Sequence, residues 1–286
     1  MKGLFVPQFT AFNKSQKVDY VATKEHGSWL LENGATGLVP FGTFGEGSSL
    51  SLSEKKRITG DLLNIVNGKI LIPTVISNSL DEITEYIEFA NDLPVHAIMV
   101  APPSYFRPIS DSQLIEFFKH ICAKSTHPII AYNIPATAIK ISSKVASSIP
   151  VWGVKDSSGD LKSAEEFLSE NVKVMIGSDR LLLDALEKGA SGGICGFANI
   201  FPERMALVFR DFSSGRIFEA AEELNSVLSF TSIFLKPEYS AGESIAVVKA
   251  LANLLNPIPL GEVRLPSANF VLTDEQKTLL LHKIMA

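Results

Sequence analysis

Cysteine is scarce in this sequence, and its scarcity excludes several kinds of structural support. Only Cys122 and Cys195 occur among the 286 residues, and they form no CxxC pair. The five histidines are scattered and show no HExxH spacing. Disulfide frameworks and metal sites need paired or closely spaced ligands, so we expect neither. We interpret the two cysteines as small buried hydrophobes in a reducing cytoplasm.

Long runs of one kind of residue are absent as well. The formal net charge is only −5 at pH 7 and no long run of lysine and arginine occurs, which argues against a nucleic-acid partner. No apolar run approaches the roughly 18 residues that a membrane span needs. The first ten residues, MKGLFVPQFT, are too short and too interrupted by proline for a signal peptide. We therefore expect a cytoplasmic protein without a membrane or nucleic-acid partner.

Short β-rich runs recur along the first two thirds of the chain, each followed by an amphipathic stretch. The runs lie at about 3–8, 37–40, 70–75, 96–101, 128–132, 152–155, 172–176 and 192–195. Strands that alternate with helices indicate parallel βα units, and eight such units predict an α/β fold of the closed (β/α)8 TIM-barrel type. An open doubly wound sheet is the alternative. No GxGxxG follows the first strand, which argues against the dinucleotide-binding form of that sheet.

Helix-start signals support this reading, and the pattern changes near the C-terminus. Ser51 with Glu54, and Ser110 with Gln113, have the spacing of a capping box. From about residue 214 helical stretches follow one another without a strand, at about 217–234, 240–255 and 273–284. We predict a barrel over residues 1–213 and a helical extension over residues 214–286 that packs on it.

A glycine-rich segment follows the second predicted strand, where a barrel builds its active site. The segment reads GTFGEG, and its glycines are Gly42, Gly45 and Gly47. The order GxxGxG matches neither a Walker loop nor a dinucleotide fingerprint. Backbone N–H groups in such a turn can face a small anion such as a carboxylate. A tight turn without any ligand is the alternative interpretation.

Tyr132 and Lys155 stand at the ends of two neighbouring predicted strands. Alone, Tyr132 would be interpreted as a core or interface tyrosine, and Lys155 as a solvated lysine. Together they should face one rim of the barrel. An amine in an apolar setting is more often neutral, because desolvation penalises the ammonium form, and a neutral amine attacks a ketone to give a Schiff base. A nearby phenol can move the protons that this chemistry requires.

These segments together resemble one family, the pyruvate-dependent class I aldolases typified by dihydrodipicolinate synthase and N-acetylneuraminate lyase. The resemblance covers almost the whole chain and includes five motifs in the same order. They are the GTxGE turn at Gly42–Glu46, the PPxYxRP-like stretch at Pro102–Pro108, YNxP at Tyr132–Pro135, GxK(D/E) at Gly153–Asp156, and GSD at Gly177–Asp179.

The resemblance implies a role for several residues. Lys155 would form the imine with the 2-keto carbon of pyruvate, and Tyr132 would transfer protons. Thr43 would link Tyr132 to Tyr105 of a neighbouring subunit, and the turn at Gly42 would hold the pyruvate carboxylate. It also implies a homotetramer, built as a dimer of dimers, that needs neither a cofactor nor a metal.

Two positions depart from the family pattern and bear on the substrate. Phe44 stands where many members carry a second threonine or serine. Thr137 stands where the synthases carry an arginine that grips a second carboxylate, an interaction of about 1.5–3 kcal/mol. The segment YNIPATA is more similar to the archaeal-type 2-keto-3-deoxygluconate aldolases. We therefore expect the chain to cleave 2-keto-3-deoxygluconate, with the galactonate epimer as a further candidate, to pyruvate and glyceraldehyde.

Other residues are candidates for binding the sugar acid. Gly177 and Ser178 belong to the GSD motif. Arg107 is a candidate ligand for a phosphate or a hydroxyl group, and a surface or subunit-interface salt bridge is its alternative role. The stretch 232–240 offers only Lys236 as a cation, which favours the non-phosphorylated substrate.

Two alternatives remain open. One is dihydrodipicolinate formation, or another pyruvate-dependent lyase or dehydratase reaction of the same family. The other is a barrel that binds a small keto acid and regulates without catalysing. The presence of both Lys155 and Tyr132 favours an enzyme.

Overall fold

Short parallel strands and alternating helices form the first two thirds of the molecule. The computed structural model describes residues 1–236, 239–267 and 269–285. The strands are β1 (Gly3–Val6), β2 (Gly37–Leu38), β3 (Ile70–Leu71), β4 (Thr74–Val75), β5 (Ile98–Val100), β6 (Ile129–Asn133), β7 (Gly153–Asp156), β8 (Val174–Ile176) and β9 (Gly192–Ile194). Their order in the sheet is β3-β2-β1-β9-β8-β7-β6-β5-β4.

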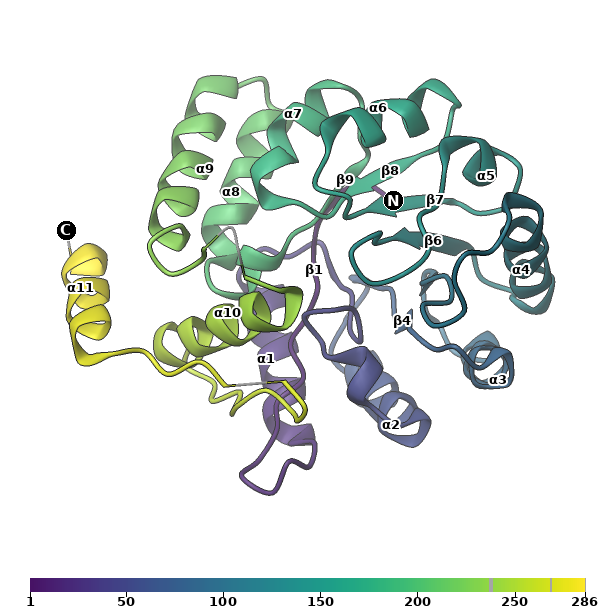
Figure 1. Ribbon diagram of the computed structural model, residues 1–286. Helices are drawn as coiled ribbons and strands as arrows, with labels where there is room; N and C mark the ends of the chain where they lie inside the picture. The colour runs from purple at the N-terminus through teal and green to yellow at the C-terminus, as the bar shows by residue number, and fades with distance from the viewer. Residues whose placement is uncertain (237–238, 268, 286) are drawn as a thin grey trace.

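The sheet closes on itself through the stretch that contains β3 and β4. β3 pairs with β2, and β4 pairs with β5, although only Ile72 and Pro73 separate β3 from β4. Hydrogen bonds continue through this interval: Ile72 N donates to Leu38 O at 2.9 Å, and Met99 N donates to Pro73 O at 2.9 Å. Pro73 has no N–H to donate, which interrupts the ladder without ending the strand. The predicted (β/α)8 barrel is therefore confirmed against the open sheet (Figure 1).

Helices surround this barrel and follow its strands in turn. They are α1 (Tyr20–Glu32), α2 (Leu52–Leu63), α3 (Leu80–Asn91), α4 (Asp111–Lys124), α5 (Ser143–Ser147), α6 (Leu161–Ser169), α7 (Leu182–Glu187) and α8 (Pro202–Ser213), with short 3-10 turns η1 (Gly47–Ser49), η2 (Asp179–Leu181) and η3 (Gly196–Asn199). Both predicted capping boxes are confirmed, at the starts of α2 and α4. The side chain of the N-cap serine accepts a backbone N–H there, so each helix begins at the predicted residue.

The core has two layers, as a parallel barrel requires. One cluster fills the barrel interior and consists of Phe5, Val39, Ile72, Ala97, Met99, Ala101, Ile130, Tyr132, Ile134, Ala138, Met175 and Ile194. A larger cluster lies between the strands and the helices. Side chains alternate along a strand. Because Val154 belongs to the outer cluster, its neighbour Lys155 faces the interior with Tyr132.

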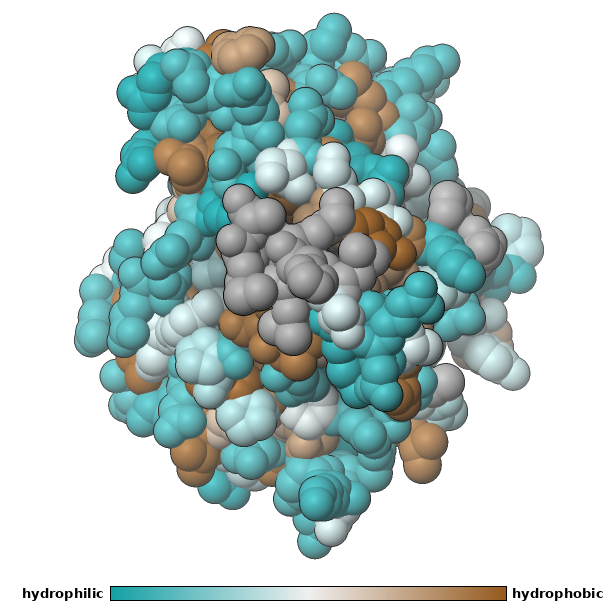
Figure 2. Space-filling model, turned by 90° about the vertical axis from the view of Figure 1, so that its left-hand side faces the viewer, coloured by the Kyte–Doolittle hydropathy of each residue, from teal (hydrophilic) through white to brown (hydrophobic). Residues whose placement is uncertain are grey.

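Three helices follow the barrel: α9 (Ile217–Thr231), α10 (Ala241–Leu255) and α11 (Asp274–Met285). α9 packs against α8, α10 contacts η3, and α11 lies at the edge of the molecule (Figure 1). The side of the molecule shown in Figure 2 carries hydrophobic residues dispersed among hydrophilic ones. Of the two free cysteines, Cys195 is buried as expected, whereas Cys122 is only partly buried. In the described part of the chain, no helix is long and apolar enough to cross a membrane.

Candidate active site

Lys155 and Tyr132 lie side by side at the carboxyl ends of β7 and β6. They are register partners in the parallel ladder. Both are almost fully buried, with exposed fractions of 3% and 2%. The Lys155 Nζ atom lies 4.3 Å from the centroid of the Tyr132 ring. Among the described residues, Lys155 Nζ has no hydrogen-bond or ion-pair partner, so the amine faces a phenol ring and the apolar barrel interior.

The residues that follow each of these two side chains fix their position. Asn133 Nδ2 donates to Asp156 Oδ1 at 2.7 Å, which ties the end of β6 to the end of β7. Asn133 Oδ1 accepts from Ile141 N at 3.0 Å, and Asp156 Oδ2 accepts from Ser158 Oγ at 3.0 Å. All polar atoms of this buried pair therefore have partners, as a rigid support requires. The asparagine of YNxP and the aspartate of GxKD act on the geometry of the site.

Thr43 is hydrogen-bonded to Tyr132. Its Oγ1 lies 3.0 Å from the Tyr132 hydroxyl, and either oxygen can donate the hydrogen bond. Thr43 belongs to the turn that follows β2. A Cβ at Gly45 would lie 2.6 Å from Phe41 N, and one at Gly47 would lie 1.7 Å from Phe41 O. Only glycine allows such a close backbone approach, so the two glycines hold the turn compact and bring Thr43 to Tyr132.

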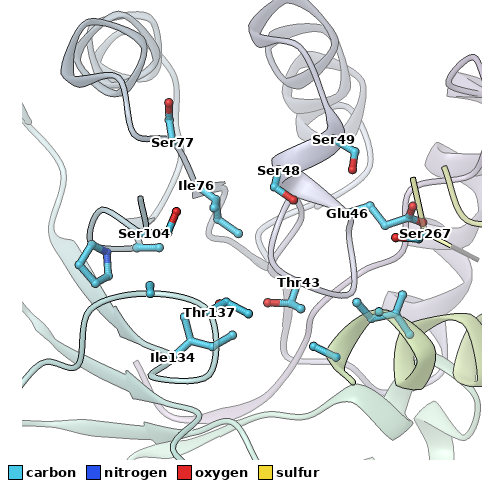
Figure 3. Close-up of a pocket in the computed structure, with 16 residues that line it drawn as sticks. Thr43, Glu46, Ser48, Ser49, Ile76, Ser77, Ser104, Ile134, Thr137 and Ser267 are labelled. Carbon is cyan, nitrogen blue, oxygen red and sulfur yellow. The ribbon is translucent and has the colours of Figure 1, made fainter. Parts of the chain in front are cut away.

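Two cavities flank this turn. The first has a volume of about 340 Å³ and is lined by Thr43 and Thr137 among others (Figure 3). The second has a volume of about 430 Å³ and is lined by Phe44, Gly177 and Ser178 among others. The predicted binding residues are thus divided between two spaces. Gly42 lines neither cavity, and the nearest atom to a Cβ added there would be Thr74 Oγ1, at 3.9 Å.

The departure from the family pattern at Phe44 gives the second cavity an apolar wall. The Phe44 ring lies 5.7 Å from the Phe9 ring, measured between centroids. It also covers Gly196, where an added Cβ would lie 2.4 Å from the Phe44 ring. A phenylalanine offers no hydroxyl to a carboxylate, so an anion at this position of the turn has only backbone N–H groups as donors from Phe44 and its glycine neighbour Gly45.

Tyr105 and Arg107 lie outside the cluster formed by Lys155, Tyr132 and Thr43. Tyr105 is 78% exposed, and its ring packs edge-on against Phe106 at 5.2 Å between centroids. Arg107 Nε donates to Ser104 O at 2.8 Å, and its Nη2 donates to Thr137 O at 3.2 Å. Within the described part of the chain Arg107 therefore binds backbone carbonyls and makes no salt bridge. An exposed Tyr105 is what the predicted contact with a neighbouring subunit requires, and that contact stays a prediction.

Sequence reasoning quoted Asp179 in the GSD motif without giving it a role. Its carboxylate accepts from Gly196 N at 3.1 Å and from Phe197 N at 3.0 Å. Burial raises the pKa of Asp179 to about 6, although these amides and Lys155 act in the opposite direction. Asp179 lines the second cavity and anchors η3 beside it. Its position directly after Gly177 and Ser178, two predicted binding residues, is the sequence signal that could have indicated a role in the site.

Sequence reasoning missed a buried ion pair between Glu46 of the turn and Lys249 of α10. Glu46 Oε1 lies 2.7 Å from Lys249 Nζ, and the two side chains are 5% and 1% exposed. Burial lowers the pKa of Lys249, and the Glu46 carboxylate opposes that shift. The residues lie 203 positions apart, so no local pattern could have indicated the contact.

The fold and the buried amine of Lys155 define the class of protein. It is an α/β barrel whose candidate catalytic groups stand at the carboxyl ends of its strands. The chain belongs to the dihydrodipicolinate synthetase family, whose model matches residues 1–284. This is a family of class I pyruvate aldolases and related enzymes, and the resemblance recognised from the motifs is confirmed.

Relatives of known activity fall into two groups. A 4-hydroxy-tetrahydrodipicolinate synthase of Methanopyrus kandleri is 32% identical over 271 residues, which cover 91% of this chain and 84% of the relative. The structure of a 2-keto-3-deoxygluconate aldolase variant of Sulfolobus solfataricus is 26% identical and covers 99% of this chain and 95% of its own, with a TM-score of 0.87. A dihydrodipicolinate synthase structure is also 26% identical, with a TM-score of 0.87 and coverages of 100% and 98%. The comparisons establish the family, and both activities occur within it.

Proposed function

We propose that this chain is a Schiff-base aldolase that reversibly cleaves 2-keto-3-deoxygluconate to pyruvate and glyceraldehyde. The observation that carries the proposal is the buried Lys155 Nζ, 4.3 Å from the ring centroid of Tyr132. The Tyr132 hydroxyl in turn lies 3.0 Å from Thr43 Oγ1. A nucleophile, a proton-transfer group and a hydroxyl that orients it are the parts that imine chemistry needs.

These groups support a complete reaction. The Lys155 amine attacks the C2 ketone, the Tyr132 hydroxyl gives its proton to the departing water, and a protonated imine remains. The Tyr132 oxygen, having given up its proton, takes the proton of the C4 hydroxyl. The C3–C4 bond breaks, and its electron pair forms the C2–C3 double bond of an enamine while the imine electron pair returns to nitrogen. Glyceraldehyde leaves, C3 takes a proton back from the Tyr132–Thr43 pair, and water releases pyruvate from Lys155 and returns the imine's proton to Tyr132.

The first cavity favours a neutral polyhydroxy aldehyde. Seven of its residues carry hydroxyl groups, namely Thr43, Ser48, Ser49, Ser77, Ser104, Thr137 and Ser267. Among the described residues that line it, the only charged one is Glu46, which is already paired with Lys249. Hydroxyl groups suit the C5 and C6 hydroxyls of the substrate, whereas a carboxylate-bearing aldehyde would find no cation there. The galactonate epimer offers the same groups and is a further candidate substrate.

Specific observations support two alternatives. The relatives named as 4-hydroxy-tetrahydrodipicolinate synthases support condensation with aspartate semialdehyde. Arg180 and Lys236 both line the second cavity, and the sequence did not predict that these two cations share one cavity. Paired cations support a phosphorylated sugar acid, because a phosphate needs several charged donors to offset its desolvation.

Trapping with borohydride tests the proposal. Pyruvate and borohydride should add one reduced pyruvyl group to Lys155, detected by mass spectrometry of its peptide, and Lys155→Ala should abolish both label and turnover. A label on another lysine contradicts the assignment. A panel of 2-keto-3-deoxygluconate, its galactonate epimer, its 6-phosphate and aspartate semialdehyde then identifies the partner. Cleavage of the 6-phosphate as fast as that of the free sugar acid would favour a phosphate site in the second cavity. Efficient condensation with aspartate semialdehyde would favour the synthase activity.

We also propose that the active form is a homotetramer in which Tyr105 enters the site of a neighbouring subunit. The supporting observation is the exposure of Tyr105 and Phe106, two adjacent aromatic side chains at 78% and 73% on the loop after β5. Exposed aromatic residues are typical of protein interfaces. Closed symmetric assemblies are also the common state of soluble oligomers.

A further inference from the structure

Lys249 Nζ connects three segments of the chain at one point beneath the turn. It donates to Glu46 Oε1 at 2.7 Å, to Thr10 O at 2.8 Å and to Glu262 O at 3.1 Å. An ammonium group has three protons, and each has an acceptor here. The second Glu46 oxygen, Oε2, accepts from Arg264 N at 2.7 Å. The buried charges are therefore fully hydrogen-bonded, which is the condition under which a buried pair is tolerated.

The turn depends on this arrangement because of its own conformation. Glu46 has a φ of 52°, in the left-handed region that residues other than glycine rarely adopt. Its N–H donates to Thr43 O at 3.1 Å, so the position of Glu46 is transmitted directly to Thr43. Thr10 Oγ1 donates to Gly45 O at 2.7 Å and fixes the residue directly before Glu46. A residue in a strained conformation persists when surrounding contacts hold it there. Lys249 supplies the central contact, because it bonds the Glu46 side chain to two backbone carbonyls.

We propose that Glu46 and Lys249 are positioning residues, which hold the turn so that Thr43 stays within hydrogen-bonding distance of Tyr132. The helical extension is thereby a working part of the catalytic site. Ala241, Gly242 and Ile245 of α10 also form part of the wall of the first cavity, next to Glu46. The inference rests on the proposed function, since it assigns the pair to proton transfer by Tyr132. A purely structural pair would alter stability without altering that step.

The test separates imine formation from proton transfer. Borohydride labelling of Lys155 reports the imine, and exchange of the pyruvate C3 protons with D₂O, followed by proton NMR, reports proton transfer. In Lys249→Met and Glu46→Gln, labelling at saturating pyruvate should persist, while the exchange rate should fall by roughly 10- to 100-fold, within the range that acid–base groups contribute. The double variant removes both charges, so its Tm should recover relative to the single variants. Its exchange should stay slow, because Thr10 O and Glu262 O still lack their donor.

Arg204→Met is the control. It removes an ion pair between Arg204 of α8 and Glu223 of α9, in the same C-terminal part of the chain, and it leaves every hydrogen bond of Glu46 and Lys249 in place. Its Tm should fall while exchange continues at the wild-type rate. If the double variant exchanges protons at the wild-type rate, the inference is wrong while the proposed function still stands. If the single variants do not fold, the result from the double variant decides. A wild-type enzyme that shows neither label nor exchange instead overturns the proposed function, and the inference with it.

Discussion

Single side chains in this molecule owe their chemistry to what surrounds them. Lys155 is an amine beside a phenol and apolar side chains, and Asp179 is a carboxyl group held by two amides. His26 is completely buried between the rings of Phe9 and Trp29, with centroid distances of 6.3 and 6.0 Å. Neither of its ring nitrogens has a hydrogen-bond partner among the described residues. Burial thus raises the pKa of Asp179 and makes His26 a source of acid sensitivity.

Removing one hydroxyl tests the role of Tyr132. Tyr132→Phe keeps the ring that packs in the barrel interior, so the fold and the Tm should change little. The rate of aldol cleavage should fall by about 100- to 10,000-fold, the usual contribution of a general acid–base group. Steady-state kinetics with 2-keto-3-deoxygluconate measure the loss, and turnover close to that of the wild type would remove Tyr132 from the mechanism.

His26 predicts how stability depends on pH. Burial, followed by the charge of Lys249, lowers the pKa of His26 to about 3. Below pH 6.5, the ordinary pKa of histidine, His26 binds a proton in the unfolded chain but not in the folded chain. Stability therefore falls as pH falls from 6.5 towards 3. The slope from this group approaches about 1.4 kcal/mol per pH unit. His26→Phe should therefore make Tm fall less between pH 6.5 and pH 4.

Asp179 acts in the opposite direction over part of this range. Its raised pKa of about 6 means that the folded state gains stability as pH falls from 6 to 3.8. Since His26→Phe leaves Asp179 in place, the difference between the two Tm profiles isolates the histidine. Parallel profiles for wild type and variant would show that His26 does not govern acid unfolding.

Among the elements, the turn between β2 and α2 has no space for a side chain at Gly47. An added Cβ at Gly47 would lie 1.7 Å from Phe41 O, so Gly47→Ala must displace the turn. We expect a lower Tm and a loss of turnover of at least about tenfold, because misplacement by about 1 Å is enough to slow catalysis strongly. Gly60→Ala is the control, since nothing lies within 4 Å of a Cβ added in the middle of α2. Equal activity of the two variants would contradict this account.

Elements were predictable where their signals were local. The serines of the capping boxes and the recurrent apolar runs predicted the starts of α2 and α4 and all eight strand positions. The ends of β6 and β7 were placed one residue too early, because Asn133 and Asp156 are polar and their pairing with each other is visible only in the sheet. Lys155 and Tyr132 were predictable because strand ends share a rim. The pairing of Glu46 with Lys249 depends on how α10 packs, which no local pattern encodes.

At the scale of the whole molecule, the site requires more than one part of the chain and, by our proposal, more than one subunit. Mixing inactive Tyr105→Phe and Lys155→Ala subunits should restore part of the activity. A subunit with an intact Lys155 would then receive an intact Tyr105 from its neighbour. Turnover after subunit exchange, confirmed by native mass spectrometry, measures the rescue. Exchange without any rescue would show that Tyr105 does not act across an interface.

By our proposal, the contact between Glu46 and Lys249 also determines when, during synthesis, the site can first work. Thr10 and Glu46 leave the ribosome well before Lys249 and Arg264, which follow Glu46 by 203 and 218 residues. A nascent chain can therefore form most of its βα units as they emerge, but the turn that carries Thr43 stays unsupported until 203 further residues after Glu46 have been added. Closing such a distant contact is slow compared with local folding. By our proposal, proton transfer by Tyr132 should accordingly begin only after Lys249 has emerged and α10 has packed against the turn.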